Sequence, residues 1–156
     1  MKNLPFEIVR AQAQDAAALL DYQLFAKVNG EIIGTASLNR KPNRMSHRAE
    51  FGISLKKAWW GCGAASALTE GVLAFARESG VEQVNLEVRS DNRRAIALYE
   101  KLGFRKLCTF PGFFKINGEL IAFDFMNLSL RSIDNLSFGS YNSDITTGKR
   151  RIKYGD

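Results

Sequence analysis

The chain contains 156 residues, of which 46% are hydrophobic and 24% are charged, and its formal net charge is +6 at pH 7. This length and composition predict one soluble globular domain with a proper hydrophobic core. No apolar run is as long as a membrane span, the N-terminus lacks the apolar core of a signal peptide, and only two cysteines occur. We therefore expect a cytoplasmic protein.

The positive charge favours anionic partners, such as nucleotides or acidic substrates. Because the basic residues are spread along the chain without a nucleic-acid-binding motif, we expect neither nucleic acid nor a membrane as partner. Cys62 and Cys108 lack metal-ligand spacing, and His47 is the sole histidine, which excludes a multi-histidine metal site. No metal is expected, and the sequence leaves a homodimer open.

The first part of the chain predicts a strand, a helix and a hairpin. Apolar and polar residues alternate over 6–10, and an Ala- and Leu-rich helix is expected over 13–20. Asn29-Gly30 is a strong hairpin signal between strands at 24–28 and 31–38. The polar residues 39–46 predict a loop.

The centre and end of the chain predict further strands and two helices. A strand over 48–55 precedes a helix that begins at Ala64 and stops at Gly80. A strand over 83–88 precedes a helix capped by Asp91 or Asn92. Strands over 104–110 and 113–116 flank Pro111-Gly112, and the Asn117-Gly118 turn leads to a strand over 120–128.

This order of elements predicts an α/β (α+β) fold, with helices on the faces of a mixed sheet. Residues 1–131 form the expected single domain. Residues 132–156 are rich in Ser, Asn, Asp, Gly, Lys and Arg, and predict a polar, flexible tail.

A glycine-containing turn precedes the first central helix. Gly61 and Gly63 lack Cβ atoms, so a ligand can approach the backbone closely. The first N–H groups of the following helix have no partner within the helix and lie at its positive end. The turn therefore predicts either a phosphate site or a tight turn whose glycines only relieve strain.

The residues from Glu50 to Phe104 resemble the acetyl-CoA-binding half of the GNAT superfamily of N-acetyltransferases. The strand 50–55 and the turn 60–65 carry part of the resemblance, and the turn fits the family's Q/R-x-x-G-x-G/A at Gly63 and Ala65. The most specific segment is N-R-R-A-I-A-L-Y-E-K-L-G-F at 92–104, which resembles N-x-x-A-x-x-L-Y-x-K-x-G-F. The resemblance implies a mostly antiparallel, acyl-CoA N-acyltransferase-like sheet in which the strand ending at Leu55 splays from the strand over 83–88. It also implies that a pantetheine arm pairs with the backbone near 53–55 and that the pyrophosphate lies on the amides of 61–66.

Two departures from the family pattern concern the cofactor turn and the acceptor side. Trp60 stands where the turn usually carries Gln or Arg. Residues 21–23 are nearly all that joins the first helix to the next strand, where family members carry a second helix that walls the acceptor site. The expected N-terminal helical region is therefore shortened, and the acceptor pocket is open or built from other residues.

The resemblance implies direct transfer of an acetyl group from acetyl-CoA to a primary amine through a tetrahedral intermediate. Tyr99 is the expected general acid for the thiolate; the alternative is an aromatic residue of the helix core. Glu50 is the expected base, with His47 as second choice; the alternative is a surface carboxylate near Arg48. Cys108 is expected in the core. The implied cofactor-binding residues are Ile53, Ser54, Leu55, Trp60, Gly61, Cys62, Gly63, Ala64, Ala65, Ser66, Asn92, Ala95 and Tyr99.

Two other functions compete with N-acetyltransferase. The spacing Gly61-x-Gly63-x-x-Ser66, with Glu87 about 20 residues further on, approaches a dinucleotide-binding motif. However, residues 56–60 separate this turn from its strand, and the chain is short for a substrate domain. A non-catalytic acyl-CoA-binding or interaction module of the same fold is the stronger alternative. The acceptor, a small molecule or a protein amine, stays open.

Overall fold

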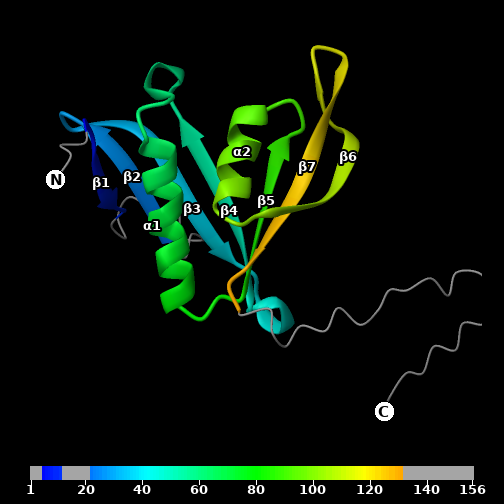
Figure 1. Cartoon of the computed structure of the whole chain (residues 1–156), viewed down its shortest axis with the longest axis horizontal. Coiled ribbons are helices and arrows are strands. Elements are labelled where there is room, and N and C mark those ends of the chain that lie inside the picture. Colours follow the sequence, from blue (N-terminus) through cyan, green and yellow to red (C-terminus); the bar gives the residue numbers. More distant parts are fainter. Residues whose placement is uncertain (1–4, 12–21, 132–156) are drawn as a thin grey trace, which may run out of the picture.

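The structure is a computed structural model that describes residues 5–11 and 22–131 (Figure 1). The expected helix over 13–20 and the expected tail over 132–156 lie outside the described residues. Within them, one sheet and two α-helices form the domain, with two short 3₁₀ turns. The elements are β1 (Glu7–Arg10), β2 (Tyr22–Val28), β3 (Glu31–Arg40), η1 (Asn43–Met45), β4 (Arg48–Leu55), η2 (Lys57–Trp59), α1 (Ala64–Glu78), β5 (Gln83–Arg89), α2 (Arg93–Lys101), β6 (Arg105–Ile116) and β7 (Glu119–Ser129).

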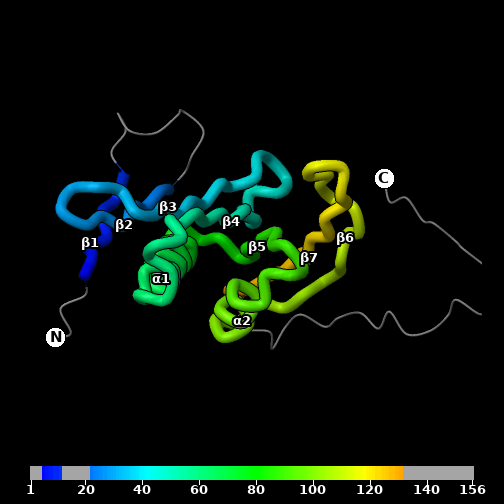
Figure 2. The backbone as a smooth tube through the Cα atoms, turned by 90° about the horizontal axis from the view of Figure 1, so that it is seen from above, coloured from blue at the N-terminus to red at the C-terminus, as the bar shows by residue number. Residues whose placement is uncertain are grey.

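The sheet has the order β1-β2-β3-β4-β5-β7-β6. Within the described residues, β4 and β5 form the one parallel pair, and every other neighbouring pair is antiparallel. This confirms the expected mixed, mostly antiparallel sheet. Helices α1 and α2 both cover the same face (Figure 2), so the part of the other face formed by β4, β5 and β7 is free of described helices.

The two hairpin turns form where the sequence places them. Asn29 and Gly30 have φ angles of 49° and 81°, and Asn117 and Gly118 have 49° and 82°. Consecutive positive φ angles match the strand twist, and Asn and Gly adopt them most readily. The two Asn-Gly predictions are therefore confirmed, and the second turn forms the tip of the long β6–β7 hairpin (Figure 1).

Strand β6 differs from the prediction of two strands flanking a Pro-Gly break. It runs without interruption from Arg105 to Ile116, and its register to β7 shifts between Phe110 and Phe114. Because β6 is an edge strand, Pro111 needs no sheet partner on its free side, and the irregularity absorbs the Pro-Gly pair. The prediction that Cys108 is a core residue is wrong: Cys108 is exposed on this edge strand.

The core lies between α1, α2 and the covered face of the sheet. Leu68, Val72 and Ala76 of α1 are fully buried, as the helical spacing of the apolar residues requires. Helix α1 lies so close to β2 that a Cβ atom at Gly71 would stand 2.7 Å from Leu24 Cδ1. No helix within the described residues is long and apolar enough to cross a membrane.

A buried carboxylate ties the β5–α2 connection to the β6–β7 hairpin. Asp124 is 4% exposed, and it accepts hydrogen bonds from Ser90 Oγ at 2.6 Å and Thr109 Oγ1 at 2.7 Å. These hydroxyl groups, first that of Ser90, hold the pKa of Asp124 below its usual value. The start of α2 is therefore fixed relative to the hairpin.

Candidate functional site

Strands β4 and β5 separate halfway along the sheet. They pair only from Arg48 to Glu50 on β4 and from Gln83 to Asn85 on β5, although both strands continue beyond those residues. Such a separation exposes backbone hydrogen-bonding groups that an ordinary sheet would use. The splayed strands therefore form a gap in the centre of the sheet.

The register between β3 and β4 shows which backbone groups face this gap. The Lys56 N–H donates to the Ile33 carbonyl at 2.8 Å, and Gly34 lies opposite Leu55. Gly34 and Leu55 therefore form a non-hydrogen-bonded antiparallel pair, so the N–H and C=O of Leu55 point away from β3. The same alternation directs the backbone groups of Ile53 into the gap, where an extended amide-containing ligand can pair with them.

The turn before α1 ends at the same gap. Gly61 and Gly63 have φ angles of 83° and 91°, a conformation that residues with a Cβ adopt at a cost. Gly63 is the N-cap of α1, no side chain caps this helix, and its first turn carries no acidic residue. The first N–H groups of this 15-residue helix are therefore open to an anion.

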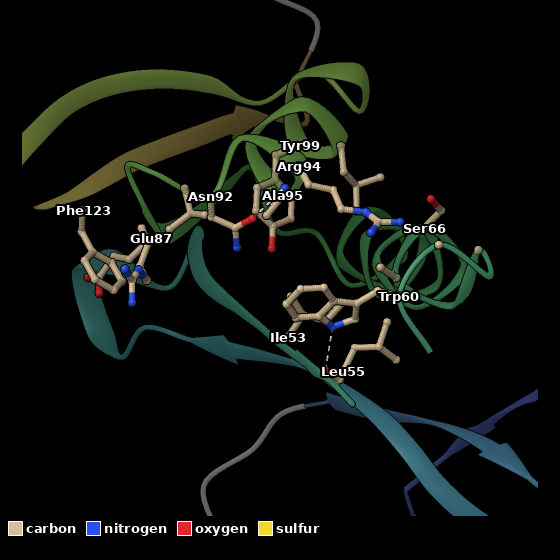
Figure 3. Close-up of a pocket in the computed structure, with 16 residues that line it drawn as sticks. Ile53, Leu55, Trp60, Ser66, Glu87, Asn92, Arg94, Ala95, Tyr99 and Phe123 are labelled. Carbon is tan, nitrogen blue, oxygen red and sulfur yellow. Dashed lines mark hydrogen bonds between the residues drawn. The ribbon is translucent and has the colours of Figure 1, made fainter. Parts of the chain in front are cut away.

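A cation that the sequence analysis did not single out lies over this turn. A Cβ atom at Gly61 would stand 2.6 Å from Nη2 of Arg94, so the guanidinium group occupies the space that the glycine leaves. Figure 3 shows Arg94 extending from α2 toward Ser66 at the start of α1. Arg94 occupies a variable position of the 92–104 motif, so no spacing rule marked it.

These elements line a cavity of about 440 Å³ between β4, β5, α1 and α2 (Figure 3). Most of the residues expected to bind the cofactor line it. Three of the expected residues, Ser54, Cys62 and Ala64, do not line the cavity. The thiol of Cys62 donates a hydrogen bond of 3.0 Å to the Trp59 carbonyl, and Ala64 is fully buried. The lining residues are Ile53, Leu55, Trp60, Gly61, Gly63, Ala65, Ser66, Glu87, Val88, Arg89, Asn92, Arg94, Ala95, Leu98, Tyr99 and Phe123.

The indole of Trp60 extends into this cavity. Its Nε1 donates a hydrogen bond of 3.1 Å to the Leu55 carbonyl, and the residue is 53% exposed. In Figure 3 the ring lies between Ala95 and Tyr99 of α2 on one side and Ile53 and Leu55 of β4 on the other. The Trp60 indole therefore occupies the Leu55 carbonyl, one of the backbone hydrogen-bond acceptors that the separation of the strands exposes.

Asn92 and Tyr99 are positioned by α2. Asn92 Oδ1 accepts from the Ala95 N–H at 3.2 Å, which confirms the predicted N-cap. Tyr99 follows Ala95 by four residues and lies on the same face of the helix. Its ring makes edge contacts with Phe51 and Phe104, at centroid distances of 6.1 and 5.8 Å. Burial raises the pKa of Tyr99 to about 12, so its hydroxyl stays protonated near neutral pH.

Glu50 and His47 do not line this cavity. Glu50 lies at the last position of β4 that pairs with β5. Its carboxylate forms an ion pair with Lys41 Nζ at 2.5 Å, and not with the neighbouring Arg48. It lines a second cavity of about 330 Å³ on the sheet face opposite the helices. His47 lines neither cavity, and its backbone carbonyl accepts from the N–H groups of Glu82 and Gln83.

Glu87 is a second residue of this site that the acetyltransferase resemblance did not mark. It lines both cavities, and within the described residues its carboxylate has no ion pair or side-chain hydrogen bond. The alternation of burial along β5 places Val84, Leu86 and Val88 in the core and Glu87 on the other face. That alternation is visible in the sequence, but it does not show that the neighbouring strand moves away at this level.

The sheet, the gap and the two cavities define an acyl-CoA N-acyltransferase-like fold. The family described as "Acetyltransferase (GNAT) family" matches residues 3–104, and the chain belongs to it. L-amino acid N-acetyltransferase AaaT from Escherichia coli is 34% identical over 102 residues, which cover 64% of this chain and 62% of that protein. N-alpha-acetyltransferase RimI from Mycobacterium tuberculosis is 30% identical over 106 residues, 67% of this chain and 65% of that protein. The chain therefore spans less than two-thirds of the length of these curated relatives.

Solved structures agree with the fold. YncA, a putative acetyltransferase from Salmonella typhimurium with its cofactor acetyl-CoA, superposes with a TM-score of 0.66 at 25% identity, covering 70% of this chain and 65% of that chain. A GCN5-related N-acetyltransferase from Kribbella flavida has a TM-score of 0.71 at 18% identity, covering 81% of this chain and 98% of that chain. The second likeness concerns the fold alone.

Proposed function

We propose that the protein is an acetyl-CoA-dependent N-acetyltransferase that transfers the acetyl group directly to a primary amine. The observation that carries this proposal is the cavity of about 440 Å³ where the strands separate, with an uncapped helix N-terminus at one end and Tyr99 along its wall. Membership of the GNAT family supports the same reaction. Acetyl-CoA supplies an activated thioester and a pyrophosphate.

The residues present fit this co-substrate. The backbone groups of Ile53 and the N–H of Leu55 face the gap and offer sheet-like pairing to the amides of a pantetheine arm. The N–H groups at the start of α1 and the guanidinium group of Arg94 offer positive charge to a pyrophosphate. Arg94 therefore joins the cofactor-binding residues expected from the sequence.

Tyr99 is the proposed general acid. The amine nitrogen forms a bond to the acyl carbon, the carbon–sulfur bond breaks, and the sulfur takes the hydroxyl proton of Tyr99. A simple thiol has a pKa near ~8.5 and that of Tyr99 is about 12, so complete transfer is uphill by about 5 kcal/mol. Proton transfer is therefore expected to accompany carbon–sulfur cleavage, with the tyrosinate reprotonated from solvent.

Two carboxylates are candidates for the base. A lysine-like amine is mostly protonated at pH 7, and freeing it costs about 4–5 kcal/mol without help. Glu50, the residue expected from the sequence, lines only the second cavity and is paired with Lys41. Glu87 lines both cavities and is unpaired within the described residues, which favours it as the group that takes the amine proton.

Release of the free thiol tests the proposed function. The protein is mixed with acetyl-CoA and a panel of primary amines, and the thiol is followed with a chromogenic disulfide reagent. We expect amine-dependent thiol release that is saturable in acetyl-CoA. Binding of acetyl-CoA without thiol release above background would instead support the non-catalytic acyl-CoA-binding module. Binding of NAD(H) without binding of coenzyme A would overturn both readings.

A further inference from the structure

We propose that the acceptor is a free α-amino acid with an apolar side chain, bound in the cavity of about 330 Å³ on the sheet face opposite the helices. This inference rests on the proposed function, because it assigns the amine that the reaction uses. The relatives do not decide it, since their names include an amino acid N-acetyltransferase and N-alpha-acetyltransferases. The residues that line this cavity carry the argument.

The cavity lies where the acceptor has to approach the donor site. Glu50 pairs with Asn85 at the last paired position of β4 and β5, and Glu87 follows two residues along β5. Glu87 also lines the larger cavity that contains Tyr99. A ligand amine held at Glu87 would therefore reach the proposed acyl site from the sheet face opposite α1 and α2.

Two opposite charges in this cavity have no partner within the described residues. Neither the guanidinium group of Arg48 nor the carboxylate of Glu87 makes an ion pair or a side-chain hydrogen bond there, whereas Glu50 is paired with Lys41. Arg48 is half-buried and Glu87 is exposed, and each charge can gain a charge-assisted contact from a ligand group of the opposite sign. A zwitterion satisfies both groups, with its ammonium at Glu87 and its carboxylate at Arg48.

The positions of Arg48 and Glu87 suit a small zwitterion. Arg48 lies opposite Gln83, four residues before Glu87, so the two Cα atoms are separated by about 13 Å along the strands. Both residues line the same cavity, so the charged ends of their long side chains can lie closer together than the Cα atoms. A polyamine would place a second cation beside Arg48, and the amino end of a peptide would bring a neutral amide there. Both alternatives leave Arg48 without an anion.

Apart from Glu50 and Asn85, the remaining wall of the cavity is apolar. Phe125 lies directly across from Glu87 on β7, and Met126 and Leu107 complete this side. Phe113 of the β6–β7 hairpin supports Phe125, with a ring centroid distance of 5.5 Å. Leu107 is 67% exposed, so a ligand side chain that covers it removes apolar surface from water. These contacts favour side chains such as those of Leu, Met and Phe.

The decisive experiment compares matched acceptors on the wild-type protein. Rates of thiol release are measured for L-leucine, L-methionine and L-phenylalanine, for their carboxamides, and for spermidine and an unmodified peptide. We expect kcat/KM for each free amino acid to exceed that for its carboxamide at least about tenfold, because the amide loses one charge-assisted contact. The carboxamide has the less basic amine, which is easier to deprotonate, so this preference would not arise from amine reactivity.

Arg48→Gln tests the residue that is proposed to bind the carboxylate of the amino acid. We expect this variant to lose at least about tenfold in kcat/KM for L-methionine and to change little with the carboxamide, so that the preference disappears. Arg44→Gln is the matched control, since Arg44 lies in η1 and lines neither cavity. It removes the same charge and should keep the preference. Thermal melting shows whether both variants are folded.

The outcomes separate this inference from the proposed function. Equal rates with acids and carboxamides, or a preference that survives in Arg48→Gln, would overturn the amino-acid site while leaving the N-acetyltransferase intact. A preference for spermidine or for the peptide would do the same. If no amine releases thiol, the proposed function fails. Calorimetric binding of L-methionine to the protein with coenzyme A, lost in Arg48→Gln, would then still support the site.

Discussion

The indole Nε1 of Trp60 donates a hydrogen bond of 3.1 Å to the carbonyl oxygen of Leu55, at the edge of β4 that faces the gap. An extended ligand in the gap would use this same carbonyl oxygen as a hydrogen-bond acceptor. Trp60→Phe keeps an aromatic ring but removes the donor. We expect it to tighten acetyl-CoA binding about two- to tenfold, because one protein hydrogen bond of about 0.5–1.5 kcal/mol no longer competes.

Calorimetric titration of acetyl-CoA measures this effect, and Trp60 fluorescence reports the displacement of the indole. Trp59→Phe is the control, because Trp59 packs against the core and does not line the cavity. Weaker binding by Trp60→Phe would mean that the indole holds the ligand rather than competing with it.

Tyr99→Phe should reduce kcat at least about 100-fold, the usual range for loss of a positioned acid. The Kd for acetyl-CoA should stay within about threefold of wild type, since the ring and its contacts with Phe51 and Phe104 remain. Single-turnover rates and calorimetry separate the two quantities. An unchanged kcat would remove Tyr99 from the proton transfer.

The raised pKa of Tyr99 also predicts a change in stability at alkaline pH. The folded-state pKa is about 12 and the unfolded-state pKa is near 10, so the contribution is complete below pH 10 and is lost as pH rises toward 12. We expect the free energy of unfolding to fall by up to roughly 3 kcal/mol over this interval. Urea titrations of wild type and Tyr99→Phe at pH 9, 10, 11 and 12 measure it. Identical slopes for the two proteins would contradict the assignment.

Replacing each candidate base by glutamine, which cannot accept the proton, distinguishes Glu87 from Glu50. Glu87→Gln should lower kcat/KM about 100-fold or more at neutral pH, and less at high pH, where more of the amine is already neutral. Glu50→Gln should have the smaller effect, because Glu50 is paired with Lys41 and lines only the second cavity, away from Tyr99. The pH profiles of kcat/KM for both variants provide the measurement. The reverse ranking would restore Glu50 as the base.

Arg94→Gln should weaken binding of acetyl-CoA about 10- to 100-fold, because one charge-assisted contact to a phosphate is lost. The dependence of log Kd on salt concentration should become shallower. Arg93→Gln removes the same charge at the adjacent position, which does not line the cavity, and serves as the control. Equal effects of the two substitutions would indicate that only net charge matters.

Local sequence signals determined much of the fold. The Asn-Gly pairs specify both hairpins, because few other residues adopt consecutive positive φ angles. Gly63 and Asn92 mark the starts of the two helices, and the 92–104 motif indicated the family. These features depend on neighbours in the chain, so one sequence is enough to predict them.

The candidate site depended on contacts between distant segments. The separation of β4 from β5 was expected only from the family resemblance, because strand pairing after Glu50 depends on both strands and no residue of either one alone specifies it. Long-range packing likewise brought Arg94 over Gly61, and it joined Glu50 to Lys41. The edge position of β6 accounts for the exposure of Cys108.

The sequence by itself therefore determined the class of protein, the turn types and the glycine-marked start of α1, because backbone conformation at a turn or cap is a local property. Only the tertiary structure decided which charges line the cavity on the sheet face opposite α1 and α2. Arg48 and Glu87 lie 39 residues apart in the chain, and the alignment of β4 with β5 places them along one cavity. Electrostatic complementarity depends on that distance in space rather than on separation along the chain.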